Sequence, residues 1–281
     1  MYIDYILERI SSMKVGCRLG IMNSNIIAYA DDIVLLAPSV TALQILINEV
    51  NELTWKLGLS INKEKTKCMV FKTSKLKSDP NKHFQIDNKD IEYVNTIKYL
   101  GFMLQSDLND YEDINRVLRK FYIEFNCLLR KFSHSGKEVL LYLFKHYCLQ
   151  FYGAELWMRS NRCISTIKQF SIGYHKAIKK LIGVSSHESN HYACQEACLF
   201  TFEHQINKIK ISTAFRLMKD PCSFLAKIDN YMCFSSAFYS HVNSILQDKY
   251  NVESLLGNDI DALMARIHFT QNHEEQLRST C

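Results

Sequence analysis

The chain of 281 residues is 47% apolar, 12% aromatic and 22% charged, with a net charge of +5 at neutral pH. This apolar content supports a packed core in one large domain or two to three small ones. No apolar run is long enough to span a bilayer, and the first ten residues lack the apolar stretch of a signal peptide, so we expect no membrane association.

The positive charge is concentrated in two blocks. Residues 116–180 contain thirteen basic and three acidic residues, a net of +10, and residues 56–89 carry a net of +6. The segments 1–55, 90–115 and 181–281 are each net acidic. A basic middle between acidic ends predicts a polyanion partner along the middle, and the alternative is a set of solvated helix faces.

Ten cysteines are scattered along the chain without CxxC pairs. This usage predicts free thiols in a reducing compartment, and therefore an intracellular protein, nuclear or cytoplasmic. His187, His191, Cys194 and Cys198 form a cluster of residue types that can bind zinc. The last three share one face of a predicted helix, which is awkward for tetrahedral zinc, so we expect a buried cysteine face and no structural zinc.

The N-terminal segment predicts a helix followed by a hairpin. Residues 1–11 have helical character, and residues 16–20 form a short strand or turn. The aliphatic and β-branched runs 26–28 and 33–37 predict two buried strands on either side of Tyr29-Ala30-Asp31-Asp32. Because aspartate tolerates turn geometry, the sequence predicts that Asp31 and Asp32 lie at the tip of this hairpin.

Paired carboxylates held on strands are hard oxygen ligands of the kind that Mg²⁺ binds. Two such metals can clamp the attacking and leaving oxygens of a phosphoryl transfer. The alternative for an Asp-Asp pair is a solvated turn. The apolar flanks argue against a surface turn, and Ala30 is small enough to let another group approach closely.

This Tyr-Ala-Asp-Asp hairpin resembles the catalytic hairpin of reverse transcriptases, and the sequence around it resembles the non-LTR (LINE-type) retrotransposon branch. The resemblance implies an RNA-directed DNA polymerase, a nucleotidyltransferase that binds Mg²⁺, or Mn²⁺ in its place, at Asp31 and Asp32. It also implies an RNA template, a DNA primer and deoxynucleoside triphosphates as partners, with Tyr29 and Ala30 at the substrate.

Residues 39–57 predict a helix with one apolar face, ended by Gly58. The stretch 58–71 leads into a predicted strand at 68–71 and resembles the fourth motif of these polymerases, in which a lysine lies near the triphosphate. Lys65 matches the usual place of this lysine, and Lys63 and Lys67 are close alternatives. A mobile lysine can act as general acid for the leaving pyrophosphate.

Residues 72–82 predict a loop, and residues 84–94 predict a hairpin around the polar tetrapeptide 87–90. The stretch 97–104 predicts a single strand that contains Tyr99-Leu100-Gly101 and resembles the primer grip of the family. Gly101 would let a primer backbone come close, and the alternative is a bulge in a structural strand.

Beyond residue 106 the apolar period becomes helical. A stripe from Ile114 to Phe132 predicts a first helix, residues 135–138 form a capping box for a second, and a third ends at Gly183. The stretch 152–157, Tyr-Gly-Ala-Glu-Leu-Trp, resembles the signature that follows the thumb in LINE-type enzymes. Arg116, Arg119 and Lys120 lie mainly off the stripe, so we predict that they contact nucleic acid.

We therefore predict an α+β fold, with a partial polymerase palm over residues 1–104 and a mostly helical thumb over residues 105–183. A helical region of unknown role is expected over residues 184–281, helical to about residue 219 and again at 252–269. Nothing in the sequence matches the family's first catalytic aspartate or its fingers, so we expect a fragment that is inactive by itself. The alternative is a noncatalytic retrotransposon relic that binds nucleic acid through the basic thumb.

Overall fold

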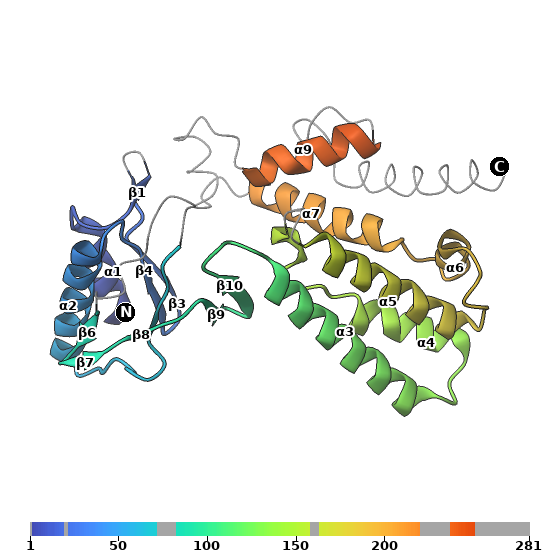
Figure 1. The fold of residues 1–281 in the computed structure, drawn as a ribbon, viewed down its shortest axis with the longest axis horizontal. Coiled ribbons are helices and arrows are strands. Elements are labelled where there is room, and N and C mark those ends of the chain that lie inside the picture. Colours follow the sequence, from blue (N-terminus) through green and yellow to red (C-terminus); the bar gives the residue numbers. More distant parts are fainter. Residues whose placement is uncertain (1, 20–21, 72–82, 158–162, 220–236, 251–281) are drawn as a thin grey trace. The chain divides into compact units, whose positions relative to one another are not determined.

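The computed structural model describes residues 2–19, 22–71, 83–157, 163–219 and 237–250, and it confirms the predicted α+β class (Figure 1). The chain divides into two compact units. The first unit holds the described residues of Met1–Ile97 together with Gln105–Leu108. The second unit holds Lys98–Leu104 and the described residues from Asn109 onward.

Two packed helices form the core of the first unit. Helix α1 (Tyr2–Ser12) contacts helix α2 (Val40–Lys56), and their facing apolar side chains are buried. The predicted ends of α2 are confirmed, because the Ser39 hydroxyl accepts a hydrogen bond from the Ala42 amide at 3.2 Å and Gly58 takes a φ of +71°. The buried members of this core are Ile6, Ile10, Leu46, Val50 and Leu53.

The predicted Tyr-Ala-Asp-Asp hairpin is confirmed. Strands β3 (Ile26–Tyr29) and β4 (Asp32–Leu35) pair antiparallel, β3 contacts α1, and β4 contacts α2. The prediction of two buried strands is wrong. Ile26 and Leu35 pack against the α1–α2 core, but Ile27 is 41% exposed. Successive strand side chains point to opposite faces, and among the described residues the helices cover one face of this ribbon.

Several two-residue strands complete the first unit. Strand β1 (Arg18–Leu19) pairs antiparallel with β2 (Met22–Asn23), as expected for the segment before the hairpin. Strand β5 (Lys67–Cys68), shorter than the predicted strand 68–71, pairs parallel with β8 (Glu92–Tyr93). The predicted loop at 72–82 lies outside the described residues.

The predicted hairpin at 84–94 forms with a tighter turn and a different second strand. Strand β6 (Gln85–Ile86) pairs with β7 (Lys89–Asp90). Asp87 and Asn88, at the turn, both have positive φ, as a type I′ turn requires. Because Asp and Asn tolerate this conformation, the turn closes with two residues, which leaves β8 to pair with β5 instead.

The prediction of one strand over 97–104 is also wrong. Strands β9 (Thr96–Tyr99) and β10 (Phe102–Gln105) pair across the two-residue turn Leu100-Gly101. The φ angles are +45° at Leu100 and +87° at Gly101. A turn with two positive φ angles matches the twist of the strands it joins, so a local hairpin replaces the continuous strand.

The second unit is helical. The predicted apolar stripe of its first helix is confirmed from Ile114 to Leu128, and Gly183 ends the predicted third helix with a φ of +75°. Ser135 does not cap the second helix, because Gly136 occupies the N-cap position without a side-chain hydrogen bond. The described helical elements are α3 (Tyr111–Phe132), α4 (Lys137–Leu143), the π-helical η1 (Phe144–Cys148), the 3-10 helix η2 (Ala154–Leu156), α5 (Ile164–Ile182), α6 (Asn190–Glu196), α7 (Phe202–Lys219) and α9 (Ala237–Tyr250).

Helix α7 confirms the predicted helical segment up to residue 219, whereas the helix predicted at 252–269 lies outside the described residues. None of the helices in the described ranges combines the length and the apolar character needed to cross a membrane.

Aromatic rings build the core of the second unit. The ring of Phe121, 1% exposed, lies in the centre of this core, with ring centroids 5.5 Å from Phe170, 6.0 Å from Phe144 and 6.1 Å from Phe151. Aromatic pairs at such separations stabilise a fold beyond the area that they bury. Most of the stripe aromatics are therefore core residues, as their spacing predicts: Phe121, Phe125, Phe144, Phe170 and Tyr174. Phe132 and Tyr147 are exceptions, since they are 40% and 66% exposed.

We predict that Phe121→Ala lowers the free energy of unfolding by about 3–5 kcal/mol, because it leaves a cavity between packed rings. Urea unfolding followed by circular dichroism measures this change. The matched control is Ile123→Ala on the same helix, since Ile123 is 69% exposed and should change stability by less than about 0.5 kcal/mol. Equal losses in the two variants would contradict the assignment of this core.

His175 is buried on α5 in its neutral form. A neutral ring satisfies both neighbours, since Nδ1 lies 2.8 Å from the Ser171 carbonyl oxygen as a donor and Nε2 accepts from the Phe202 amide at 3.5 Å. Burial lowers the pKa of His175 from 6.5 to about 4, and Lys179 and His191 add to this lowering. As the pH falls, His175 therefore takes up a proton near pH 6.5 in the unfolded chain but only near pH 4 in the folded chain.

We predict that the lowered pKa of His175 reduces the free energy of unfolding by about 3 kcal/mol as the pH falls from 6.5 to about 4. Above pH 6.5 the residue should make no pH-dependent contribution. His175→Gln keeps a donor and an acceptor but does not titrate, so its unfolding free energy should fall less over this interval. Urea unfolding of both proteins at pH 7, 5.5 and 4.5 tests the prediction. Parallel pH profiles would contradict it.

Candidate functional site

The two predicted catalytic aspartates lie at the turn of the β3–β4 hairpin. Ala30 and Asp31 form the turn, with a φ of +52° at Ala30, and Asp32 begins β4 opposite Tyr29. Asp31, Asp32 and Ala30 are exposed, and Tyr29 is 66% exposed. The hairpin therefore presents its four motif residues to solvent, where a substrate can reach them.

Neither carboxylate has a hydrogen-bond or ion-pair partner within the described part of the chain. No three His, Cys, Asp or Glu side chains of the described residues gather as metal ligands, so a metal here would take two protein carboxylates. This donor set fits Mg²⁺, which prefers hard oxygens, keeps several waters and completes its shell with substrate phosphates. The hairpin can therefore hold a divalent ion only together with ligands from elsewhere.

The three candidate lysines before β5 differ in their partners. Lys63 Nζ lies 2.7 Å from Asp87 Oδ2, and Lys67 Nζ lies 2.5 Å from Glu92 Oε2. Lys65 is exposed, and its ammonium group has no acidic partner among the described residues. Of the three, Lys65 is thus the lysine whose charge remains available to a ligand, which agrees with its match to the family motif.

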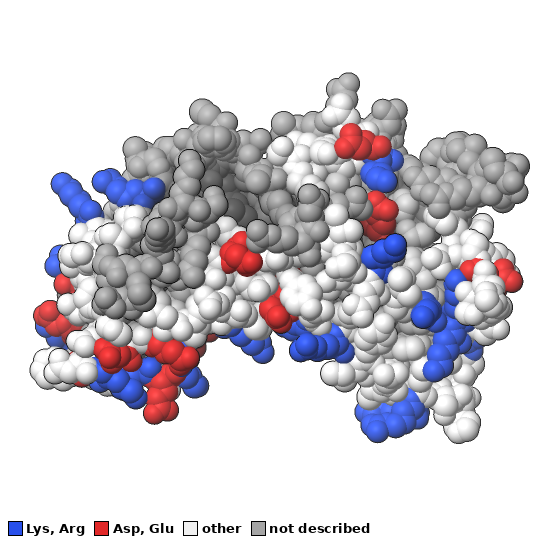
Figure 2. Space-filling view, in the orientation of Figure 1, with Lys and Arg blue, Asp and Glu red and all other residues white. Residues whose placement is uncertain are grey.

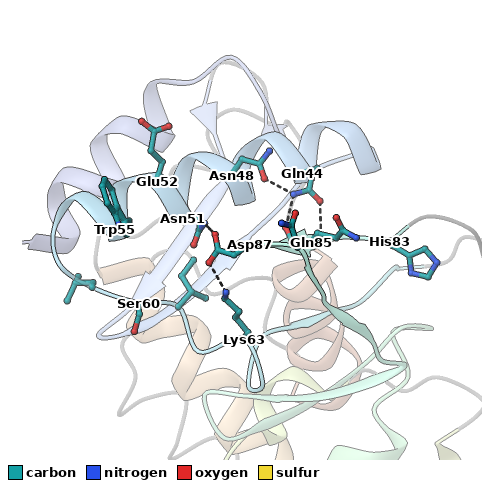
Figure 3. A pocket seen from close by; sticks show the side chains of 13 residues that line it. Gln44, Asn48, Asn51, Glu52, Trp55, Ser60, Lys63, His83, Gln85 and Asp87 are labelled. Carbon is teal, nitrogen blue, oxygen red and sulfur yellow. Dashed lines mark hydrogen bonds and ion pairs between the residues drawn. The ribbon is translucent and has the colours of Figure 1, made fainter.

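A polar cavity of 880 Å³ lies beside α2 in the first unit (Figure 3). On one wall of this cavity the side chain of Gln44 binds the backbone of β6. Its amide group donates to the Gln85 carbonyl at 2.9 Å and accepts from the Gln85 N–H at 3.0 Å. Asn51 donates to Asp87 Oδ1 at 2.6 Å, and this bond with that of Lys63 lowers the pKa of Asp87. Asp31, Asp32 and Lys65 are absent from the described lining, so the predicted catalytic groups lie apart from this cavity.

The predicted primer-contacting residues Tyr99, Leu100 and Gly101 lie at the turn of the β9–β10 hairpin. All three are partly buried. A Cβ added to Gly101 would lie 3.1 Å from Cε1 of Tyr152, so the ring of Tyr152 is the group that needs this glycine in the structure. Gly101 is a turn residue, so the alternative of a strand bulge is wrong. A contact with a primer stays a prediction.

The three basic candidates on α3 differ in exposure. The Arg116 side chain is 23% exposed, and it donates from Nε to Asp113 Oδ1 at 2.8 Å and from Nη2 to the Tyr152 carbonyl at 2.9 Å. Arg119 is exposed, and Lys120 is exposed with Glu124 at 3.5 Å. Arg119 and Lys120 therefore present positive charge to solvent, whereas Arg116 is largely buried and donates twice within the protein.

Basic side chains gather over the helices of the second unit. Figure 2 shows Lys and Arg over α3 and α4 with few acidic side chains beside them, whereas the two signs are interspersed over the first unit. Arg119, Lys120, Arg130, Lys131, Lys137 and Lys145 are exposed on α3, α4 and η1. Exposed aromatic rings lie among them, including Tyr142 at 63% and Tyr147 at 66%. Positive charge interleaved with aromatic rings is typical of nucleic-acid surfaces.

The predicted cysteine face is wrong in part. Helix α6 ends at Glu196, and Cys198 lies beyond it with a φ of +52° and an exposed side chain, whereas Cys194 is buried. His191, Cys194 and Cys198 therefore do not lie on one continuous helical face. The chain reverses just after α6, and a sequence period cannot anticipate that end.

Three residues of the second unit have a role that the sequence reasoning missed: Asp113, Tyr152 and Trp157. Asp113 is 5% exposed and accepts a hydrogen bond from Trp157 Nε1 at 2.9 Å. Its spacing of four and eight residues before Val117 and Phe121 places an acid on the apolar stripe of α3. Because aspartate is rarely buried without partners, this spacing was the signal that could have found it.

The comparisons with known proteins give one match. Residues 1–104 match the family model described as reverse transcriptase (RNA-dependent DNA polymerase). The matched stretch contains Asp31, Asp32, Lys65 and the Leu100-Gly101 turn, and it supports the reverse transcriptase family, whose members take a template, a primer and nucleotide substrates with a divalent metal. Neither the curated proteins nor the solved structures gave a match.

Proposed function

We propose that the first unit is part of the palm of a LINE-type (non-LTR) reverse transcriptase and that α3 to α5 belong to its thumb. One observation carries the proposal. Asp31 and Asp32 lie exposed at the tip of the β3–β4 hairpin, without a side-chain partner among the described residues, inside the 104 residues that match the reverse transcriptase model. A solvated turn would explain the exposure but not the family match.

In this proposal Asp31 and Asp32 hold Mg²⁺, or Mn²⁺ in its place. When bound, the ion supplies Lewis-acid stabilisation of phosphoryl oxygens during nucleotidyl transfer. The chain's own contribution is to hold both carboxylates exposed at the turn of the β3–β4 hairpin. Lys65 gives a proton to the leaving pyrophosphate, since its ammonium has no acidic partner in the described part of the chain, whereas Lys63 and Lys67 form ion pairs with Asp87 and Glu92.

The proposed substrates are an RNA template, a DNA primer and deoxynucleoside triphosphates. Tyr29 and Ala30 flank the nucleotide, and the turn formed by Tyr99, Leu100 and Gly101 contacts the primer end. Arg119 and Lys120 contact the phosphate backbone from the thumb. The scattered cysteines further support an intracellular location, nuclear or cytoplasmic, where thiols stay reduced.

We predict that this 281-residue chain by itself shows no DNA synthesis. Polymerases of the family that this chain resembles use three carboxylates to hold two metal ions. This sequence matches two of the three, so the two-metal site is incomplete. Primer extension on an RNA template with Mg²⁺ or Mn²⁺ measures the activity. Processive extension that Asp31→Ala abolishes would contradict the prediction and would show that another acid of the chain completes the site.

A second function is favoured by the charge distribution. A noncatalytic relic that binds nucleic acid through the thumb needs only the basic surface, and residues 116–180 carry a net of +10. Phosphate contacts release counterions, so such binding weakens steeply with salt and has little sequence preference. An RNA–DNA hybrid should bind at least as well as a single strand, since a groove-shaped site reads duplex shape and phosphates.

We predict that Arg119→Ala with Lys120→Ala lowers the slope of log Kd against log salt by about one to two for an RNA–DNA hybrid. Fluorescence anisotropy between low and physiological salt measures the slope. Arg116 is left intact because its contacts with Asp113 and Tyr152 hold the fold together.

The matched control is the double variant Arg216→Ala with Lys249→Ala. Both residues are basic and lie on α7 and α9 in the net acidic segment 181–281. This control should leave the slope unchanged. Equal slopes for the wild type and the α3 double variant would identify Arg119 and Lys120 as solvated charges and would contradict the proposed interface.

A further inference from the structure

We propose that the buried carboxylate of Asp113 and the hydroxyl of Tyr152 are positioning groups that fix the Leu100-Gly101 turn against the N-terminal end of α3. The inference rests on the proposed function in one respect, since it takes this turn as the group that meets the primer end. The positioning itself rests on contacts within the second unit.

Asp113 joins β10, α3 and Trp157, which follows η2, through hydrogen bonds. Its Oδ1 accepts from the Met103 amide of β10 at 3.0 Å and from Arg116 Nε of α3 at 2.8 Å. Its Oδ2 accepts from Trp157 Nε1 at 2.9 Å. The side chain is 7% exposed, so water compensates little of its charge. Removing any donor leaves a buried charge partly unpaired, which makes the three segments depend on one another.

Tyr152 holds the turn from its other side. The hydroxyl donates to the Leu100 carbonyl at 3.0 Å, and the ring stacks on Phe102 with centroids 4.7 Å apart. The Tyr152 carbonyl in turn accepts from Arg116 Nη2 at 2.9 Å. A tyrosine and an arginine therefore complete a closed set of contacts around the hairpin turn, with Asp113 opposite.

The neighbouring backbone also requires this arrangement. A Cβ added to Gly153 would lie 2.9 Å from Asp113 Oδ2 and 3.0 Å from the Phe102 ring, and the φ of this glycine is +101°. Leu100 takes a φ of +45°, which is costly for a branched residue with a bulky side chain. Strain of this kind persists only where the surroundings hold it, and the bond from Tyr152 to the Leu100 carbonyl is one such restraint.

A simpler role for Asp113 is to stabilise the first turn of α3 through the helix dipole. That role does not explain the hydrogen bonds that Asp113 accepts from Met103 and Trp157, because both donors lie outside α3. It also gives no reason for the hydroxyl of Tyr152 or for glycine at 153. The contacts are organised around the hairpin turn, which points to positioning of that turn.

Hydrogen exchange measured by mass spectrometry on the whole chain tests the positioning directly. Tyr152→Phe keeps the ring stack and removes the bond to Leu100, so amides of Lys98–Leu104 should exchange about fivefold faster. Asp113→Asn places an amide group against one of three donors, so the same peptide should exchange more than about tenfold faster. The control is Tyr147→Phe, which changes an exposed tyrosine of η1. It should change neither the exchange rate of the Lys98–Leu104 amides nor the melting temperature.

A spectroscopic readout separates positioning from simple stability. An RNA–DNA hybrid with 2-aminopurine at the primer 3′ end reports stacking of the terminal base. With Tyr152→Phe we expect a changed emission of the bound terminus, while Kd stays within about twofold of the wild-type value because the phosphate contacts are unchanged. The melting temperature should also stay at the wild-type value.

The outcomes are distinct. Wild-type exchange and emission in Tyr152→Phe would overturn the inference. Faster exchange across α5 as well as the hairpin, with a lower melting temperature, would show a general structural role and would also overturn it. No binding of the hybrid by the wild-type chain would contradict the proposed function, and the exchange of Lys98–Leu104 would then decide the positioning alone.

Discussion

The buried carboxylate of Asp113 imposes the strictest constraint on the described structure. A charge withdrawn from water must be met by donors, and here they come from β10, from α3 and from Trp157 just after η2. Satisfying one side chain therefore fixes three segments at once. Gly153 must lack a side chain beside this carboxylate, and Gly101 must lack one beside the Tyr152 ring.

The same residue type serves an opposite purpose at the β3–β4 tip. Asp31 and Asp32 are exposed and have no partner within the described residues, so their oxygens stay available to an ion. Both oxygens of Asp113 accept hydrogen bonds within the fold. The basic residues show the same division, because Arg116 is bound inside the second unit whereas Arg119 faces solvent. Exposure, more than residue type, separates groups that can act on a ligand from groups that hold the fold.

Where the sequence pattern failed, turns with positive φ explain the failure. The stretch 97–104 is apolar apart from Lys98 and Gly101 and predicts one strand, yet Leu100 adopts a conformation that leucine rarely takes and the chain reverses. The tetrapeptide 87–90 closes after two residues because Asp87 and Asn88 both accept positive φ. Propensity describes average residues, whereas each of these turns depends on a particular backbone conformation.

The sequence by itself determined several periodic elements: the hairpin with Asp31 and Asp32 at its end, the helix that begins near Ser39, and the apolar stripe of α3. These elements depend on local spacing, because apolar residues at the period of a helix or strand lie on one face of it, and burial of that face stabilises the element. Only the tertiary structure decided which charges are available. The ion pairs of Lys63 and Lys67 and the hydrogen bond from Trp157 to Asp113 join residues far apart in the chain, and spacing along a sequence carries no information about such contacts.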